Sequence, residues 1–407
     1  MRHNFLNKHA LLAGLSIAAL GLSSCLDKGD ESIILENAMS QLVADIPSDD
    51  MATPNPTVNN PTTTLPNATC SVEKNGDGVY VASINMTGVW NEDAEDWLKL
   101  YGTAYDKQNV WVSVDGNPKG IDVYNTADGE GARTVSADLV FLVDNSGSMS
   151  EEADAIAKEI TNWTSNLEKS GLDIRYGCVG YGSAVGNNNY SYLEKNYGLS
   201  GALNLTTYDQ LNYYLNNRSV TGVRRTIGYF GTDANKLSTY AASDFYSKAG
   251  GECGVLALRF ADQYFSFRAG SNRIYVNFTD DANYHGSTDE RSVKFLQTDQ
   301  WNTLKGTVHT VFSGNETWVE SRTYGDAPWL MSDYTGGTII KVKTDFSDAS
   351  LASLPVTGAM QNSYIIRFTN ISEFMDGQPH VVKVTVVSND GKVQAEKEFY
   401  VIFGVAE

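Results

Sequence analysis

The chain has 407 residues, a hydrophobic content of 42% and a formal net charge of -19 at pH 7. The length allows two or three domains, and the hydrophobic content is sufficient for packed cores, which excludes a wholly disordered chain. The acidic balance provides no field that would attract phosphate, so we expect no nucleic-acid partner.

The first 24 residues are typical of a secretory signal peptide. Arg2 and Lys8 precede an apolar run, residues 10–22, that is too short to span a bilayer comfortably. The run ends at residues 22–25 in Leu-Ser-Ser-Cys, which resembles the lipobox of bacterial lipoproteins. The resemblance implies that Cys25 is acylated and becomes the first residue of the mature chain. The alternative is an ordinary signal peptide followed by a free cysteine.

The residues after Cys25 bear on location. Leu26 stands where many lipoproteins retained at the inner membrane have Asp, so the resemblance implies a lipid anchor in the outer membrane. The periplasmic and the surface face both stay open. Residues 25–69 are predicted to form a tether, because Pro47 to Pro66 is rich in Pro, Thr and Asn and is typical of an extended, unpacked linker.

Two segments, residues 70–136 and 356–407, alternate apolar and polar residues with a period of two, which predicts β-strands. The second segment has only three predicted strands, too few for a core of its own. We therefore expect the two segments to pack together as one β-sandwich. The predicted strands are residues 79–84, 110–114, 364–368, 380–387 and 398–403.

Residues 137–355 alternate predicted strands with predicted helices. This order predicts an α/β domain with a central, mostly parallel sheet and helices on both faces. The domain would be flanked by the β-sandwich or inserted in it. Ligands of such sheets bind beyond the carboxyl ends of the strands. The predicted strands are residues 138–143, 173–181, 273–279, 307–312 and 337–342.

The first of these strands ends in one acid and two hydroxyls. Asp144, Ser146 and Ser148 lie in the turn between the apolar strand and a helical pattern that begins at Ser150. Their alternate spacing allows all three side chains to point to one side of the turn. Carboxylate and hydroxyl oxygens are hard ligands of the kind that Mg²⁺ accepts. The alternative is a helix cap, where Asp and Ser are also favoured.

A second acidic turn, Asp280 and Asp281, follows the predicted strand at residues 273–279. In a parallel sheet Asp280 emerges at the same edge as Asp144. The pair at 280–281 alone is also consistent with a solvated turn. Taken with Asp144, Ser146 and Ser148, however, it predicts a divalent-cation site, with Mg²⁺ expected first and Mn²⁺ or Ca²⁺ as alternatives.

Residues 137–355 resemble the von Willebrand factor type A domains. The Asp-x-Ser-x-Ser motif of that family is matched at residues 144–148, its Thr-Asp at residues 279–280, and its Thr-Gly-Gly at residues 335–337. The resemblance implies a Rossmann-like domain with a metal-ion-dependent adhesion site. In the family the cation keeps one position open for an acidic group on the partner protein.

The sequence departs from the family at one position. Glu252 stands in a Gly-Gly-x loop where the family usually has Thr. Glu252 would ligate the metal directly or through water, or it would face solvent in a shifted loop. An added carboxylate strengthens cation binding but weakens the attraction for an acidic ligand, because the charge of the metal is already offset.

Residues 183–249 form a long insert that contains nine of the 22 tyrosines of the chain. Tyr is enriched at binding surfaces, because it supplies a large contact area and a polar tip at low entropic cost. The insert is therefore either a recognition surface or an elaborated layer of packed tyrosines. The candidate ligand-binding residues are Tyr190, Tyr192, Tyr213 and Tyr214.

These features predict a binding protein. We expect a cell-envelope lipoprotein that presents a metal-bearing domain to a protein or a surface polymer, through an acidic group of that ligand or otherwise. The alternative is a fixed structural subunit of an envelope complex or appendage in which metal serves stability alone. An enzyme is not expected. A Mg²⁺-dependent phosphatase-like hydrolase needs a second acid where Ser146 stands, and the chain has no Walker-type loop.

Overall fold

In the computed structural model the chain forms two compact units. Unit 1 comprises the described residues within 1–62, 70–135 and 361–407, and unit 2 those within 63–69 and 136–360. The structure describes residues 46–75, 77–91, 93–104, 106–125, 136–150, 152–169, 172–182, 199–216, 228–230, 252–286, 289–302, 304–348, 351 and 355–405.

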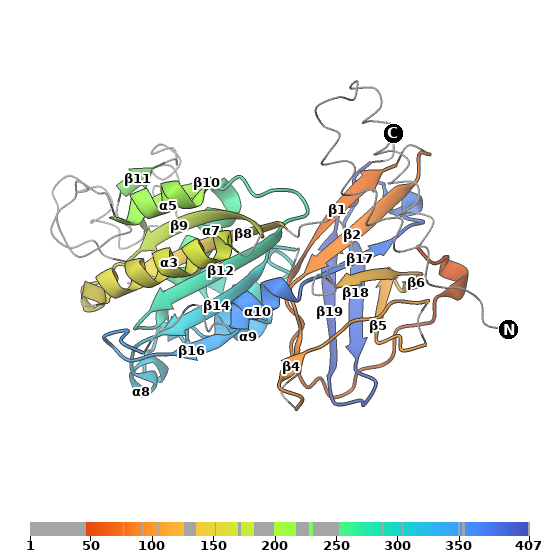
Figure 1. The fold of residues 1–407 in the computed structure, drawn as a ribbon. Coiled ribbons are helices and arrows are strands. Elements are labelled where there is room, and N and C mark those ends of the chain that lie inside the picture. The colour runs from red at the N-terminus through yellow and green to blue at the C-terminus, as the bar shows by residue number, and fades with distance from the viewer. Residues whose placement is uncertain are drawn as a thin grey trace, which may run out of the picture. The chain divides into compact units, whose positions relative to one another are not determined.

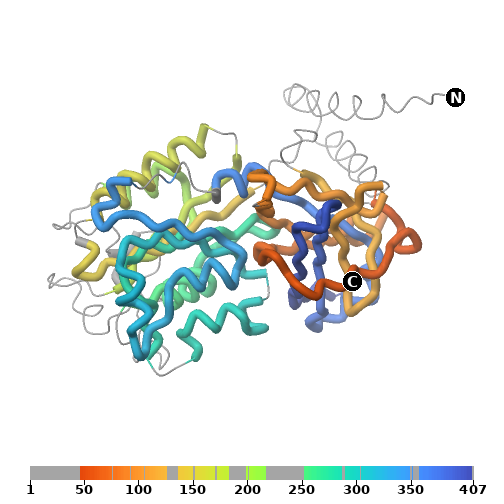
Figure 2. The backbone as a smooth tube through the Cα atoms, turned by 90° about the horizontal axis from the view of Figure 1, so that it is seen from below, coloured from red at the N-terminus to blue at the C-terminus, as the bar shows by residue number. Residues whose placement is uncertain are grey.

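Unit 1 is built from two four-stranded sheets, to which strands before and after the central segment both contribute (Figure 1). The late strand β17 pairs antiparallel with the early strands β2 and β7, and β18 pairs antiparallel with β5. Figure 2 accordingly shows orange and blue segments side by side in this unit. In sheet order, the strands are β1 (Ala68–Lys74), β2 (Tyr80–Met86), β17 (Tyr364–Phe368) and β7 (Asp122–Asn125), then β19 (Gln394–Val401), β18 (His380–Val387), β5 (Val110–Val114) and β6 (Asn117–Lys119).

The expected unpacked tether ends well before residue 69. Asn55 donates side-chain hydrogen bonds to the backbone oxygen of Lys383 and to Oγ1 of Thr385. The backbone N–H of Thr62 donates to the backbone oxygen of Gln394 at 2.8 Å. Residues 46–62 lack a hydrophobic pattern of their own, but their backbone and amide groups pair with the sheet of unit 1. A sequence pattern does not show such pairing, because it depends on distant strands.

Unit 2 contains one seven-stranded sheet with the order β11-β10-β9-β8-β12-β14-β16. β8 lies at the centre and runs parallel to β9 and β12, and β14 and β16 continue in the same direction. β10 runs antiparallel to β9, and β11 runs parallel to β10. In chain order, the strands are β8 (Ser136–Asp144), β9 (Asp173–Tyr181), β10 (Leu199–Thr206), β11 (Gly228–Phe230), β12 (Asn272–Thr279), β14 (Thr307–Phe312) and β16 (Ile339–Lys341).

Alternate side chains of β8 enter two separate cores. Phe141 packs in the core beneath α3 and α5, whereas Leu142 packs in the core beneath α7 and α9. α3 buries Ile156, Ile160 and Trp163, which are spaced four and three residues apart along one face. The helices are α3 (Ala153–Glu168), α5 (Tyr208–Asn216), α7 (Gly254–Tyr264), α8 (Glu316–Glu320), α9 (Leu330–Thr335) and α10 (Pro355–Gln361).

Short elements complete the described chain. Two short two-stranded sheets are antiparallel, the pair β3 and β4 in unit 1 and the pair β13 and β15 in unit 2. Among the described residues, no helix combines the length and the apolar character needed to cross a membrane. The short elements are β3 (Trp90–Asn91), β4 (Asp96–Trp97), β13 (Asn283–Tyr284), β15 (Gly325–Asp326) and the 3-10 helices Asp49–Met51, Ser148–Ser150, Asp289–Arg291, Val293–Gln297 and Ser372–Phe374.

The predicted fold class, an α/β protein built on a Rossmann-like, mostly parallel domain, is wrong. The chain is predominantly β, and antiparallel pairings form every sheet except the seven-stranded one, which is itself mixed. Within residues 137–355, the prediction considered only strands that alternate with helices. It missed β10, which lies inside the tyrosine-rich insert and returns beside β9 in the opposite direction. The direction of a strand depends on its pairing partner, which the local sequence pattern does not contain.

Candidate metal centre

The ends of three neighbouring strands bring the predicted site residues to one edge of the sheet. β8 and β12 run parallel with Val143 beside Phe278, and Asp144 lies in register with Tyr181 of β9. The residues that follow these positions therefore emerge together at the carboxyl edge of the sheet. Asp144 and Asp280 lie close there because they end adjacent parallel strands.

Asp144 is buried and held by two donors. Its Oδ1 accepts the backbone N–H of Ser146 at 2.8 Å, and its Oδ2 accepts the hydroxyl of Thr279 at 2.9 Å. The side chain is 2% exposed. The carboxylate is thereby fixed in position between the turn after β8 and the end of β12.

The two serine hydroxyls connect this turn to Asp280. Oγ of Ser146 and Oγ of Ser148 lie 3.0 Å apart, and Oγ of Ser148 donates to Oδ1 of Asp280 at 3.1 Å. Ser146 is buried, whereas Ser148 is exposed. The cluster therefore reaches solvent on the Ser148 side, where a ligand could approach.

The helix-cap alternative for this turn does not hold. α3 begins at Ala153, and its N-cap is Glu152, which makes no capping hydrogen bond with its side chain. Asp144 and Ser146 lie well before that cap, and Ser148 begins a separate 3-10 turn. Instead, Asp144 accepts from the backbone of Ser146 and from Thr279, and the two serine hydroxyls bond to each other and to Asp280.

Glu252 lies beside Asp144, across Gly182. A Cβ atom on Gly182 would lie 2.8 Å from Oδ1 of Asp144 and 3.4 Å from Cγ of Glu252. Gly182 has a φ of +81°, a backbone conformation that favours glycine. The absence of a side chain at this position is what allows the two carboxyl side chains to approach.

Burial and mutual repulsion raise the pKa of all three carboxyl groups. For Asp144, burial is the largest cause, followed by the charges of Glu252 and Asp280. Burial is also the largest cause for Glu252 and for Asp280, and the neighbouring Asp281 raises both further. Arg322 lowers the pKa of Glu252, but not enough to reverse the shift.

This donor set fits a divalent cation. Clustered, buried carboxylates repel one another unless a positive charge compensates them. Among the described residues, no three His, Cys, Asp or Glu side chains form a metal-holding group by themselves. The set would therefore be mixed, with the hydroxyls of Ser146 and Ser148 beside the carboxylates. All of these donors are hard oxygens, as Mg²⁺, Mn²⁺ and Ca²⁺ require.

Several residues that support this centre were not predicted as site residues. Thr279 orients Asp144, and Gly182 makes room for Glu252. Arg322 lies 3.4 Å from Oδ2 of Asp281 and adds a positive charge at the rim. A glycine directly after an apolar strand, as in the Tyr-Gly pair at residues 181–182, is a weak sequence signal for a positive φ. The sequence around Arg322 contains no comparable signal.

The remaining predicted site residues lie apart from the centre or outside the described chain. Cys25, Tyr190 and Tyr192 lie outside the described residues. Tyr213 is exposed on α5, where it is accessible to a ligand. Tyr214 is buried in the core beneath α3 and α5, so it does not belong to a ligand-binding surface. Helix periodicity explains the difference, because consecutive helical residues point in different directions.

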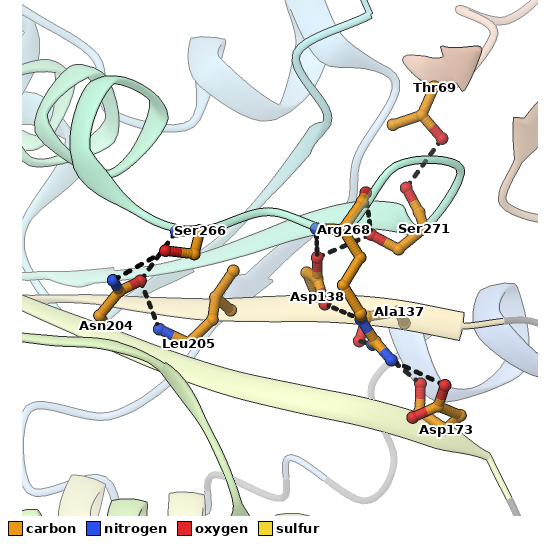
Figure 3. Close-up of polar contacts among 9 residues, drawn as sticks. All are labelled: Thr69, Ala137, Asp138, Asp173, Asn204, Leu205, Ser266, Arg268 and Ser271. Atoms are coloured by element: carbon orange, nitrogen blue, oxygen red, sulfur yellow. Dashed lines mark hydrogen bonds and ion pairs between the residues drawn. The ribbon is translucent and has the colours of Figure 1, made fainter. Parts of the chain in front are cut away.

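A second charged cluster lies at the opposite end of β8 and is fully engaged in structural bonds (Figure 3). Asp138, completely buried, accepts bonds from the backbone and Nε of Arg268 and from the hydroxyl of Ser271. Arg268 continues to Asp173 at 2.7 Å and to the backbone oxygen of Ala137. These bonds join the starts of β8, β9 and β12, and they occupy both carboxylate oxygens of the buried Asp138.

Comparison with known proteins does not place the chain in a family. No protein-family model matches the sequence, and no curated protein matches it. Among solved structures, proximal thread matrix protein 1 from the mussel byssus is similar with a TM-score of 0.32 and 8% identity, over 59% of this chain and 48% of that one. This chain thus spans about half the length of that protein. At this TM-score the likeness carries no weight for fold or function.

Proposed function

We propose that this protein binds a divalent cation at Asp144, Ser146, Ser148, Glu252 and Asp280. The cation then serves to bind a protein or a surface polymer. Mg²⁺ is the first candidate, and Mn²⁺ and Ca²⁺ are the alternatives. The proposed role is ligand binding without catalysis, in adhesion or in assembly of the cell envelope.

One observation carries this proposal. Asp144, Ser146, Ser148 and Asp280 are linked by hydrogen bonds at a sheet edge that reaches solvent, and Glu252 lies beside Asp144 across Gly182. The raised pKa values of Asp144, Glu252 and Asp280 show that the arrangement is unfavourable as a set of free anions. A site that concentrates like charges in this way is better explained by a bound cation than by stability of the bare protein.

Two sequence features support the wider proposal. The motifs at residues 144–148 and 279–280 resemble those of metal-ion-dependent adhesion sites in the von Willebrand factor type A domains. The lipobox-like sequence that ends at Cys25 supports a lipid anchor, and we propose the outer membrane as its location. The anchor would keep the cation site at the cell envelope.

Titration calorimetry tests the cation site directly. The full chain, freed of metal by chelation, is titrated with Mg²⁺, Mn²⁺ and Ca²⁺ separately. We expect one site, with Asp144→Asn weakening the affinity by more than about 100-fold, because an amide replaces a charged ligand. Asp299→Asn changes an exposed carboxylate in the same unit and serves as the control. A wild-type protein that binds none of the three cations contradicts the proposal.

A fixed structural subunit remains the second candidate, and it differs in what the cation does. In that case Asp144→Asn would lower the melting temperature in the presence of metal without releasing any partner from solubilised membranes. For a ligand-binding protein, chelation and Asp144→Asn both release the partner, and the melting temperature in the absence of metal is preserved.

A further inference from the structure

A small aromatic surface lies beside the metal centre, on two loops that share their own core. The loop after β12 and the loop after β14 are joined by the antiparallel pairing of β13 with β15, in which Tyr284 lies opposite Gly325. Ala282, Phe312 and Val319 are buried together between these loops. This packing holds the surface residues above it in fixed positions. We define the aromatic patch as Tyr284, Trp318, Arg322 and Tyr324.

Trp318 is the largest exposed side chain of the patch and is firmly oriented. Trp318 is 56% exposed, and Tyr324, nearby in the chain, is 60% exposed. The guanidinium carbon of Arg322 lies 4.2 Å from the centre of the Trp318 ring. The backbone N–H of Trp318 donates to the side chain of Asn315, which caps α8. An exposed ring held in this way is pre-organised for contact with a ligand.

The patch adjoins the metal centre directly. Arg322, which stacks on Trp318, also reaches Oδ2 of Asp281 at 3.4 Å, and Asp281 is the residue after Asp280. The backbone N–H of Tyr284 donates to the backbone oxygen of Glu252 at 2.7 Å. A ligand bound at the cation through one end would therefore extend across the aromatic side chains.

The charges at the centre decide which ligand chemistry fits. If a bound divalent cation keeps Asp144, Glu252 and Asp280 all ionised, they carry one more negative charge than the cation offsets. Arg322 does not correct this excess, because it is paired with Asp281. The occupied centre therefore does not attract a further carboxylate. Neutral oxygen donors can still complete the coordination of a hard cation.

Building on the proposed cation site, we propose that the ligand is a neutral glycan. Adjacent hydroxyl groups of one sugar bind the cation, and the apolar face of a sugar ring packs on Trp318. Hydroxyls supply neutral oxygen donors, and the flat carbon–hydrogen face of a sugar suits an exposed aromatic ring. The glycan thus satisfies both halves of the surface, which an acidic peptide does not.

Affinity electrophoresis of the full chain tests this proposal. Native gels contain mannan, galactan or dextran as neutral polysaccharides, and polygalacturonate or poly-glutamate as acidic polymers, each with Mg²⁺ or Ca²⁺. We expect at least one neutral polysaccharide to retard the protein. Chelation and Trp318→Ala should each abolish the retardation, whereas Trp90→Ala, which removes an exposed tryptophan from unit 1, should leave it unchanged.

The outcomes separate this inference from the cation site on which it rests. Calorimetry should show that Trp318→Ala binds the cation as the wild type does. If the wild type binds cations but is retarded by acidic polymers alone, or by none of the polymers, the glycan inference is overturned and the cation site stands. Retardation by a neutral polysaccharide that survives chelation also overturns it. Absence of cation binding overturns both.

Discussion

The hydroxyl of Thr279 donates a hydrogen bond of 2.9 Å to Oδ2 of Asp144. The bond joins the ends of β12 and β8. The orientation of Asp144, the most buried carboxylate of the candidate metal centre, therefore depends on a residue of the neighbouring strand. Residues of this kind fix the position of a metal ligand without touching the metal.

Replacing Thr279 by Val tests this dependence. Val keeps the branched shape but removes the donor, so Asp144 loses one of the two bonds that orient it. We expect the cation affinity to fall by about 10–100-fold in calorimetry. Thr161→Val removes a hydroxyl that bonds within α3 and should leave the affinity unchanged. Equal affinities in wild type and Thr279→Val would show that this bond has no role in the centre.

Gly182→Ala tests whether space at Gly182 is required. The new Cβ would lie 2.8 Å from Oδ1 of Asp144, in addition to the cost of a positive φ. We expect a loss of about 1–2 kcal/mol in the free energy of unfolding from the backbone alone, together with weaker cation binding. Gly391→Ala is the matched control, since Gly391 has a φ of +72° but open space around it. The prediction is contradicted if both variants bind the cation like the wild type.

Unit 2 should lose stability in acid through His309. Burial lowers the pKa of His309 from 6.5 to about 3, and its Nδ1 accepts the backbone N–H of Thr338. Below pH 6.5, His309 is therefore protonated in the unfolded chain but stays neutral in the folded chain. The stability of the fold falls as the pH decreases from 6.5 toward 3. We expect a loss of roughly 3 kcal/mol between pH 6.5 and pH 4 in urea unfolding. His309→Asn, whose Oδ1 can replace Nδ1 as acceptor, should remove that part of the pH dependence.

Unit 1 should respond to pH in the opposite direction through His380. Burial opposes its protonation, but hydrogen bonds to Asp115 and Asp376 raise the pKa of His380 overall. The pKa of Asp115 is lowered, first by its bond to His380. The stability that His380 contributes to the fold is thus present below pH 6.5 and is lost as the pH rises through its folded pKa. The stability that Asp115 and Asp376 contribute is lost as the pH falls below 3.8.

The corresponding experiment is thermal unfolding of His380→Gln at two pH values. The variant should lower the melting temperature of unit 1 more at pH 5.5 than at pH 8.5, because His380 is protonated to a greater extent at the lower pH. Lys392→Gln, which removes an exposed ion pair with Asp93, is the control and should show no such difference. An equal loss at both pH values would mean that His380 acts by packing on Phe374 and Phe403 alone.

Local sequence patterns predicted individual strands well and their assembly poorly. β9 and β14 have the bounds expected from their apolar runs, because polar or glycine residues end those runs sharply. β10 was missed within the tyrosine-rich insert, and with it the mixed character of the sheet. The strands outside residues 137–355 also make up a larger part of the chain than the prediction assumes, and this changes the fold class from α/β to mostly β.

For the candidate site, too, local patterns predict some residues, and the residues that depend on distant neighbours are missed. The spacing of Asp144, Ser146 and Ser148 after one strand, and Asp280 after another, was enough to predict that they meet at one edge. The structure places them together, and Glu252 with them. Gly182 and Arg322 were not predicted, since each matters only through a neighbour that is distant in the sequence.

The division of the chain into units has a consequence for its covalent connections. The chain passes between the units four times, after Thr62, Thr69, residue 135 and Met360. The short segment 63–69 and the long segment 136–360, which make up unit 2, are therefore each flanked on both sides by unit 1. Cutting any single one of the four peptide connections would leave the two units covalently linked through the others.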